Sequence, residues 1–314
     1  MKMKGIHIVA TGKQLPKRIV SNEELSKTVD TTDEWIRSRT GIQTRHLSVD
    51  EKNRDLASGA AKEAIKKAGI LLEQIGLIVV ATVTPDYITP STACMVQRKL
   101  GLPEDVMAFD INAGCTGFLY GLKICKGILE NIEKPYALLI GSEQLSRMVD
   151  FTDRSTCVLF GDGAGAAIIE LSNHHPYFQR VWSQGNDEAL VCLGPGNWPA
   201  TLKMDGQAVF RFAVQACKQG IDQILEDANI TLDEVDYILC HQANERIIDY
   251  VKKKYELPDS KFFMNLQKYG NTSAASIPIA IEEMTELKMI HPGTKIISVA
   301  FGAGFTWSSV LLTF

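Results

Sequence analysis

A cysteine set among small residues is the side chain best suited to nucleophilic chemistry in this chain. Cys115 lies in NAGCTGF, directly before a segment whose apolar residues have helical spacing. A thiol at the N-terminus of a helix faces unpaired N–H groups and the positive end of the helix dipole, which favour the thiolate. The alternative is a buried structural cysteine, because most lone cysteines are of that kind. The neighbouring glycines favour the nucleophile, since they let a substrate or a second backbone approach closely.

His241 and Asn271 are the other two candidates for chemistry. His241 follows the strand-like segment VDYILC and precedes a helical segment, so we expect it at the carboxyl end of a buried strand. Ligands bind at that edge in α/β sheets. Asn271 lies in YGNTSAAS, which also fits a turn followed by a helix N-cap. A structural histidine and a capping asparagine are therefore the alternatives to a catalytic pair.

The elements that must position these residues belong to an internal duplication. AIKKAGILLEQIGLIVVAT, from Ala64, aligns without gaps with ILEDANITLDEVDYILCHQ, from Ile224, and each copy has the pattern of a helix, a turn and a strand. The nearly continuous aliphatic strands are typical of a sheet that helices cover on both faces. AFDINAGCTGF and YALLIGSE have partners in the same order, FFMNLQKYGNTSAAS and KIISVAFGAGF. We therefore predict an α/β protein with two duplicated halves.

The duplication predicts where the candidates meet. We place the halves at residues 1–173 and 174–314, on either side of an interruption in the apolar pattern. If a pseudo-twofold axis relates them, the loops that hold Cys115 and Asn271 become symmetry mates near that axis, with His241 beside them. An interface between two such halves is a usual place for a ligand pocket.

Composition and charge exclude several classes of protein. A net charge of −4 gives no basic field for a phosphate backbone, so we expect no nucleic-acid partner. The seven cysteines are odd in number and form no CxxC pair, which predicts reduced thiols in the cytoplasm and no zinc site. The apolar runs are too short for a membrane span. The glycine runs FGDGAGAA and FGAGFTW are not GxGxxG motifs, and we predict that they form turns between strands.

Several strings together carry a family resemblance over the whole chain. They are TTDEWIRSRTGIQTRH, GLIVVAT, AFDINAGCTGF, DRST, FGDGAGAA, HQANERI, YGNTSAAS and FGAGFTW. With them the chain resembles the β-ketoacyl-[acyl-carrier-protein] synthases III, within the thiolase superfamily. The resemblance implies a thiolase-like fold with layers in the order α-β-α-β-α. It also implies a decarboxylative Claisen condensation of an acyl-CoA primer, by default acetyl-CoA, with malonyl-[acyl-carrier-protein]. The products would be a 3-oxoacyl carrier protein, carbon dioxide and coenzyme A, at the start of fatty-acid synthesis.

The same resemblance implies roles for individual residues. Cys115, His241 and Asn271 would form the catalytic set. The backbone N–H groups of Cys115 and Ala303 would form the oxyanion hole, where many relatives have glycine in place of Ala303. The implied coenzyme A or substrate contacts are Thr31, Trp35, Arg39, Arg154 and Asn244. The implied acyl-pocket residues are Thr89 and Phe301, and the implied carrier-protein contacts are Arg211, Gln242, Arg246, Lys252 and Lys253. For the lysines a solvated helix face is an equal alternative.

The implied partners are acyl-CoA, the malonyl carrier protein and a second copy of the chain, whose acyl pocket the loop PDYITPST would cap. No metal or other cofactor is expected. Three rival functions stay open at this stage: a polyketide or quinolone condensing enzyme, a hydroxymethylglutaryl synthase relative, and a cysteine hydrolase of thioesters. Asn271 argues against the synthase relative, in which we expect an acid. The intact set of cysteine, histidine and asparagine argues against a non-catalytic paralogue.

Overall fold

The computed structural model describes residues 4–192 and 201–314, which form two sheets with related topology. The first sheet has the strand order β1 (Gly5–Gln14), β7 (Asp162–Ser172), β6 (Tyr136–Gln144), β4 (Ile75–Ala81) and β5 (Met107–Ile111). The second has the order β8 (Phe178–Asn186), β13 (Gly304–Thr313), β12 (Lys295–Gly302) and β11 (Tyr237–Cys240). In each sheet a parallel pair, β4 with β6 and β11 with β12, is followed by antiparallel pairs, and in the first sheet β5 also pairs in parallel with β4.

The sequence repeat and the sheet topology agree. The repeated segments become α3 (Asn53–Ala68), a 3₁₀ turn η1 (Leu72–Gln74) and β4 in the first copy. In the second copy they become α7 (Gly206–Ala228), η4 (Leu232–Glu234) and β11. Every residue of β4 is buried, as the aliphatic run predicts. The division at 173/174 stays a prediction, although the loop between β7 and β8 lies there.

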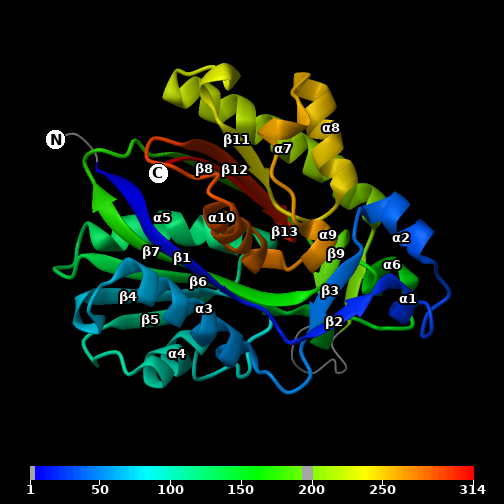
Figure 1. The fold of residues 1–314 in the computed structure, drawn as a ribbon, viewed down its shortest axis with the longest axis horizontal. Coiled ribbons are helices and arrows are strands. Elements are labelled where there is room, and N and C mark those ends of the chain that lie inside the picture. The colour runs from blue at the N-terminus through cyan, green and yellow to red at the C-terminus, as the bar shows by residue number, and fades with distance from the viewer. Residues whose placement is uncertain (1–3, 193–200) are drawn as a thin grey trace.

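Helices cover both sheets and also separate them (Figure 1). Helices α3 and α4 (Thr92–Leu100) pack on the outer face of the first sheet, and α7 and α8 (Glu245–Tyr255) pack on the outer face of the second. Between the sheets lie α5 (Gly117–Leu129) and α10 (Ser276–Glu286). The layers therefore run α-β-α-β-α, which confirms the predicted architecture.

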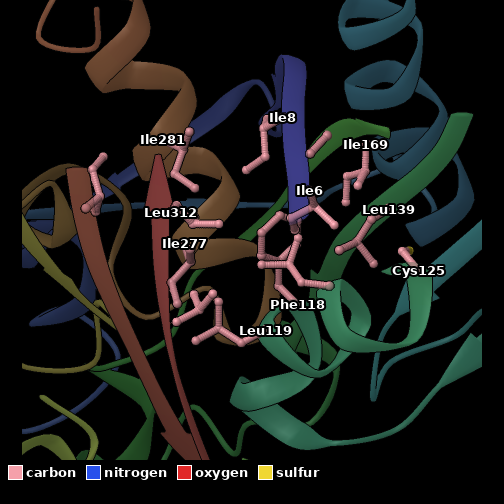
Figure 2. Close-up of a cluster of buried hydrophobic side chains, with 14 of the residues drawn as sticks. Ile6, Ile8, Phe118, Leu119, Cys125, Leu139, Ile169, Ile277, Ile281 and Leu312 are labelled. Carbon is pink, nitrogen blue, oxygen red and sulfur yellow. The ribbon is translucent and has the colours of Figure 1, made fainter. Parts of the chain in front are cut away.

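The central layer is the largest shared core (Figure 2). Phe118 and Leu119 from α5 and Ile277 and Ile281 from α10 are buried together with aliphatic side chains from both sheets, including Leu312. At about 25 cal/mol per Å² of apolar surface, such burial is the main stabilising contribution. Because both helices begin beside the candidate residues, this core fixes the site.

The remaining elements are short. The strand pairs are β2 (Arg18–Ser21) with β3 (Thr44–Leu47) and β9 (Leu190–Cys192) with β10 (Leu202–Met204). The other helices are α1 (Asn22–Leu25), α2 (Asp33–Thr40), α6 (Arg154–Cys157) and α9 (Leu266–Tyr269). The other 3₁₀ turns are η2 (Gly114–Thr116), η3 (Leu145–Arg147), η5 (Asp259–Lys261) and η6 (Ser273–Ala275).

One of the two glycine predictions is wrong. FGAGFTW forms the tight turn between β12 and β13, as predicted. FGDGAGAA instead enters β7, where Gly163 and Gly165 are strand residues. A Cβ atom on Gly165 would lie 2.7 Å from the backbone nitrogen of Ile279, so the glycine lets α10 pack directly on the strand. Close helix–strand packing, and not a turn, explains this run.

Candidate active site

Cys115 lies in the 3₁₀ turn η2, immediately before α5. The turn begins at Gly114, whose φ of +50° lies in the left-handed region that favours glycine. The end of β12 reaches this turn through Gly302. A Cβ atom there would lie 2.9 Å from the backbone nitrogen of Cys115 and 3.1 Å from its Cβ. Gly302 is therefore required for the close approach of the second sheet to the thiol.

The Cys115 thiol is neutral in this environment, contrary to our expectation of a thiolate. The residue keeps a partly exposed surface, but the surrounding protein removes enough solvent that burial raises the thiol pKa to about 11. A hydrogen bond from Ser273 lowers this pKa and the charge of Glu143 raises it. Desolvation thus outweighs the helix terminus, and the thiol must lose a proton when it reacts.

His241 directly follows β11 and is held on two sides. Its backbone N–H donates to Val299 O over 2.8 Å, and its Nδ1 lies 2.7 Å from the Ser276 hydroxyl. The Phe301 ring meets the imidazole edge to face, with centroids 5.3 Å apart. Burial lowers the pKa of His241 to about 3, so the imidazole is neutral. When the Ser276 hydroxyl donates to Nδ1, the ring carries its proton on Nε2 and can donate from there.

Asn271 is buried and its amide is oriented by its neighbours. Its backbone pairs with the segment before β7, through N–H to Leu159 O at 2.8 Å and from Gly161 N–H at 3.0 Å. The side-chain Oδ1 accepts from the Ser273 N–H at 2.9 Å. With Oδ1 occupied, the NH₂ group is the part of the amide that can donate to a ligand.

A chain of contacts joins the three residues. Ser273, which orients Asn271, also lowers the pKa of the Cys115 thiol. The neighbour of Gly302, Phe301, contacts the His241 ring. The turns η2 and η6 also pack against each other. The fold therefore brings a thiol, a neutral imidazole and an amide donor together.

The backbone of Ala303 lies beside the turn that holds Cys115. A Cβ atom on Gly114 would be 3.4 Å from the nitrogen of Ala303. The Thr306 hydroxyl links the two segments, because it lies within hydrogen-bond distance of both Ala303 O, at 3.1 Å, and Ala113 O, at 3.3 Å. The same hydroxyl lies 2.9 Å from that of Thr116. These contacts of Thr306 hold the Ala303 amide next to the turn that carries the nucleophile.

Four of the five residues expected at coenzyme A, all but Thr31, form one cluster across α2, α6 and α8. The Arg154 guanidinium lies 4.8 Å from the Trp35 ring centroid and that of Arg39 lies 5.7 Å from it. Asn244 caps α8 and donates from Nδ2 to Arg39 O at 3.1 Å. The Thr31 hydroxyl is buried without a hydrogen-bond partner among the described residues. An indole, guanidinium groups and an unpaired hydroxyl suit a polar ligand with an aromatic base.

Two of the expected carrier-protein contacts are placed differently from our expectation. Gln242 is buried, where its Nε2 donates to Cys240 O at 2.8 Å and its Oε1 accepts from Asn265 N–H at 2.9 Å. Only 11% of the Lys252 side chain is exposed, and its Nζ lies 3.3 Å from Asp249 and 3.2 Å from Asp259. Both side chains stabilise the fold around α8 and do not offer a surface contact.

The other expected surface residues are accessible. Arg211 on α7 and Arg246 and Lys253 on α8 are exposed. Thr89 is also exposed, on a loop that includes the exposed apolar residue Ile88. Phe301 is instead buried against His241.

Sequence reasoning missed Ser276, Ser273 and Glu143 as parts of the site. Ser276 and Ser273 lie in the GNTSAAS string that we interpreted as a helix cap, and Glu143 ends a strand that we compared only for its glycine. The signal available was a glutamate at the end of an otherwise aliphatic strand. It becomes meaningful only when tertiary structure shows that it is fully buried.

One cluster of potential metal ligands occurs within residues 4–192 and 201–314, formed by Glu63, Glu282 and Glu286. Lys67 pairs with Glu63 and Glu282, and Lys13 pairs with Glu286. Each of the three carboxylates is thus already paired with a lysine. Over the same residues, the structure contains no helix with the length and apolar character of a membrane span.

Known proteins are similar to the chain over almost its whole length. Models described as 3-oxoacyl-[acyl-carrier-protein (ACP)] synthase III match residues 109–184, and those of its C-terminal part match residues 225–314. The β-ketoacyl-[acyl-carrier-protein] synthases III of Clostridium botulinum strain Kyoto and Clostridium tetani are 46% and 42% identical, with 99% of each chain covered.

A solved structure agrees with these sequence relatives. The crystal structure of 3-oxoacyl-[acyl-carrier-protein] synthase III from Aquifex aeolicus has a TM-score of 0.94 and 42% identity, over 99% of this chain and 100% of that one. The predicted thiolase-like architecture is thereby confirmed, and the chain belongs to the 3-oxoacyl-[acyl-carrier-protein] synthase III family of condensing acyltransferases.

Proposed function

We propose that this chain condenses an acyl-CoA primer with malonyl-[acyl-carrier-protein] and so begins fatty-acid synthesis. The observation that carries the proposal is the grouping of the Cys115 thiol with a neutral His241 and an oriented Asn271 amide. A thiol accepts an acyl group, and two neutral donors stabilise an enolate without protonating it. A hydrolase would need a base for water, and a buried imidazole with a pKa near 3 is poorly suited to that role.

The first half-reaction loads the primer on Cys115. The sulfur attacks the thioester carbonyl, a tetrahedral oxyanion forms, and coenzyme A leaves as its thiol with the proton that Cys115 gave up. We assign the backbone N–H groups of Cys115 and Ala303 to the oxyanion, because the Ala303 nitrogen is held beside the η2 turn. Removing one such donor from an acyl-transfer site typically costs about 10²- to 10³-fold in rate.

The second half-reaction forms the carbon–carbon bond. The malonyl thioester carbonyl accepts hydrogen bonds from His241 Nε2–H and the Asn271 amide, and carbon dioxide leaves as the enolate forms. The enolate carbon attacks the acyl-cysteine, the C–S bond breaks, and the released Cys115 thiolate takes up a proton from solvent. The lowered pKa of His241 supports this division of roles, because an imidazolium would quench the enolate.

The polar cluster around Trp35 suits the nucleotide part of coenzyme A. We assign Trp35 and Arg154 to the adenine and Thr31, Arg39 and Asn244 to further contacts. The unpaired buried hydroxyl of Thr31 supports this assignment, since a buried polar group without a partner destabilises the protein until a ligand binds it.

Exposed cations suit an acidic carrier protein. We assign that surface to Arg211, Arg246 and Lys253, which are accessible on α7 and α8. We also infer that two copies associate so that the loop with Thr89 covers the partner's acyl pocket. Exposed Tyr87 and Ile88 on this loop support that inference. We further propose that the protein is cytoplasmic and needs no metal or other cofactor. Acetyl-CoA is the default primer.

Mass spectrometry of Cys115 tests the proposal. The protein is incubated with acetyl-, isobutyryl- or octanoyl-CoA, and malonyl carrier protein is then added. The expected result is an acyl mass on the Cys115 peptide, which then disappears as carbon dioxide and a 3-oxoacyl carrier protein appear. Cys115→Ser is the control for acylation at other thiols. Loss of the acyl group to water as free acid would instead establish the hydrolase, and transfer to malonyl-CoA alone would favour a polyketide-type enzyme.

A further inference from the structure

A buried carboxyl group lies behind the nucleophile. Glu143, at the end of β6, is fully buried, yet it pairs with no basic side chain among the residues that the structure describes. Its carboxylate accepts from the Thr84 hydroxyl at 2.7 Å, from the Val83 N–H at 3.1 Å and from the Ser273 hydroxyl at 3.2 Å. The Thr82 hydroxyl lies within 3.3 Å. A buried acid held by four donors and no cation needs an explanation, because its charge is costly to bury.

The threonine hydroxyls can donate only to this carboxyl group. Asn53 Nδ2 donates to the hydroxyl oxygens of Thr82 at 2.9 Å and Thr84 at 3.1 Å. Backbone N–H groups also donate to them, from Thr84 over 3.1 Å and from Gln144 over 2.8 Å. Since each hydroxyl oxygen already accepts, its own proton is free to point at Glu143. The pocket is therefore built to hold a carboxylate.

Ser273 is the connection between this acid and the thiol. Its hydroxyl lies 3.2 Å from the Glu143 carboxylate, and the turn η6 that carries it packs against the η2 turn that carries Cys115. The same hydroxyl lowers the pKa of the Cys115 thiol, as a donor to the thiolate would. A hydroxyl has one proton to donate. That proton can go to the carboxylate or to a thiolate, but not to both. The backbone of Ser273 has a φ of +50° and its N–H donates to Asn271 Oδ1, so the backbone that carries the hydroxyl is held beside the catalytic amide.

We propose that Glu143 and Ser273 are a positioning pair for Cys115, in which the Ser273 hydroxyl proton serves either the Glu143 carboxylate or the Cys115 sulfur. With Glu143 ionised, the hydroxyl is directed to the carboxylate and the thiol stays protonated. With Glu143 protonated, the acid donates to the Ser273 oxygen, and the serine proton stabilises the thiolate. One negative charge is thus shared by the two ends of the relay.

The electrostatics agree with this arrangement. Burial raises the pKa of Glu143 to about 7, opposed by hydrogen bonds from Thr84, Val83, Ser273 and Thr82, so both charge states are accessible near neutral pH. The charged group that acts on Cys115 is Glu143, and it raises the thiol pKa. Two like charges in a dry site do not ionise independently.

The pH dependence of Cys115 alkylation by iodoacetamide tests the pair. The rate is followed by mass spectrometry of the Cys115 peptide from pH 6 to 10 on the full chain. Removing the carboxylate in Glu143→Gln is expected to lower the thiol pKa by about one unit, which means about tenfold faster alkylation at pH 7.5. Ser273→Ala is expected to shift the profile the other way, because the thiolate loses its donor. General damage to the site would not speed alkylation in Glu143→Gln and slow it in Ser273→Ala.

The matched control is Glu282→Gln. Glu282 is also fully buried, but it accepts from Thr11 at 2.6 Å and pairs with Lys67, and it is not among the charges that act on Cys115. Its substitution should leave the alkylation profile unchanged. An unchanged or slower rate in Glu143→Gln would overturn the proposal.

The wild-type profile gives a second test that needs no folded variant. If the carboxyl and the thiol share a charge, log rate should rise with a slope below one between about pH 7 and 9, where Glu143 ionises and opposes the thiolate. A single slope of one over the whole range would refute the coupling. The proposal rests on Cys115 as the nucleophile, but alkylation requires neither acyl-CoA nor carrier protein. Its failure is thus distinguishable from failure of the proposed condensation.

Discussion

Replacing Gly302 with alanine should displace the nucleophile. The added methyl group would lie 2.9 Å from the Cys115 nitrogen and 3.1 Å from its Cβ, whereas non-bonded heavy atoms prefer about 3.5 Å or more. Both clashing atoms belong to the rigid η2 turn, which Thr306 holds against the β12–β13 turn. The strain therefore cannot be relieved by rotating a flexible side chain.

The expected magnitude follows from this geometry. Overpacking of this kind costs about 1–3 kcal/mol of unfolding free energy. A shift of the sulfur by a few tenths of an ångström, up to ~1 Å, should slow acylation by about 10²-fold. The shift also moves the amide of Cys115 away from the developing oxyanion. We therefore expect a loss of acylation rate larger than the loss of stability alone would give.

Single-turnover acylation by acyl-CoA and thermal unfolding together measure this prediction. Gly127→Ala is the control, because Gly127 lies on α5, the helix that Cys115 precedes, and an added Cβ meets nothing within 4 Å. That change should keep the acylation rate and stabilise the helix by up to about 1 kcal/mol. If Gly302→Ala loaded the acyl group at the wild-type rate, the close approach would have no catalytic importance and the reasoning would be wrong.

Three further predictions concern the reaction and its pH dependence. His241→Ala and Asn271→Ala should each slow decarboxylation of malonyl carrier protein by about 10²-fold or more, while acyl loading changes less. The measurement is carbon dioxide release. Native decarboxylation rates in these variants would contradict the division of roles. Trp35→Ala should raise KM for acyl-CoA by roughly 2- to 30-fold with kcat little changed, since a lost stacking contact is worth about 0.5–2 kcal/mol. A fall in kcat alone would argue against a binding role. Because burial lowers the native pKa of His241 from 6.5 to about 3, the unfolded chain takes up a proton that the native chain refuses. Wild-type stability should therefore fall as pH drops from about 6.5 towards 3, by up to ~1.4 kcal/mol per pH unit, and denaturant titrations should show a weaker loss in His241→Ala.

The repeated elements could be predicted from the sequence because their physical cause is local. The aliphatic run of β4 and the amphipathic pattern of α8 each indicate which residues are buried, and the order of similar segments predicted two related α/β halves. The roles of Trp35 and Arg154 came from resemblance, and the structure shows the two side chains in contact. No spacing along the chain could have joined them.

Residues that were misplaced or missed depend on tertiary contacts. A glutamine next to a catalytic histidine is expected at the surface, but Gln242 fits a pocket of backbone groups from Asn265 and Leu266. Lys252 belongs to a run of lysines, of which only tertiary structure shows which one turns inward to two aspartates. Glu143 was missed because the cost of burying a charge depends on donors that come from two segments far apart in the sequence.

The central layer has a consequence for synthesis of the chain. Residues of α5 are made long before those of α10, yet both helices belong to one buried cluster (Figure 2). A chain emerging from the ribosome can form the first sheet and α3, but the inner face of α5 lacks its cover until α10, Ser276–Glu286, has been made. Domains tend to fold from the N-terminus as they are made, and an exposed apolar face invites aggregation during that time. Active protein thus depends on a docking event late in synthesis, and a nascent chain stalled before α10 is a natural client for chaperones.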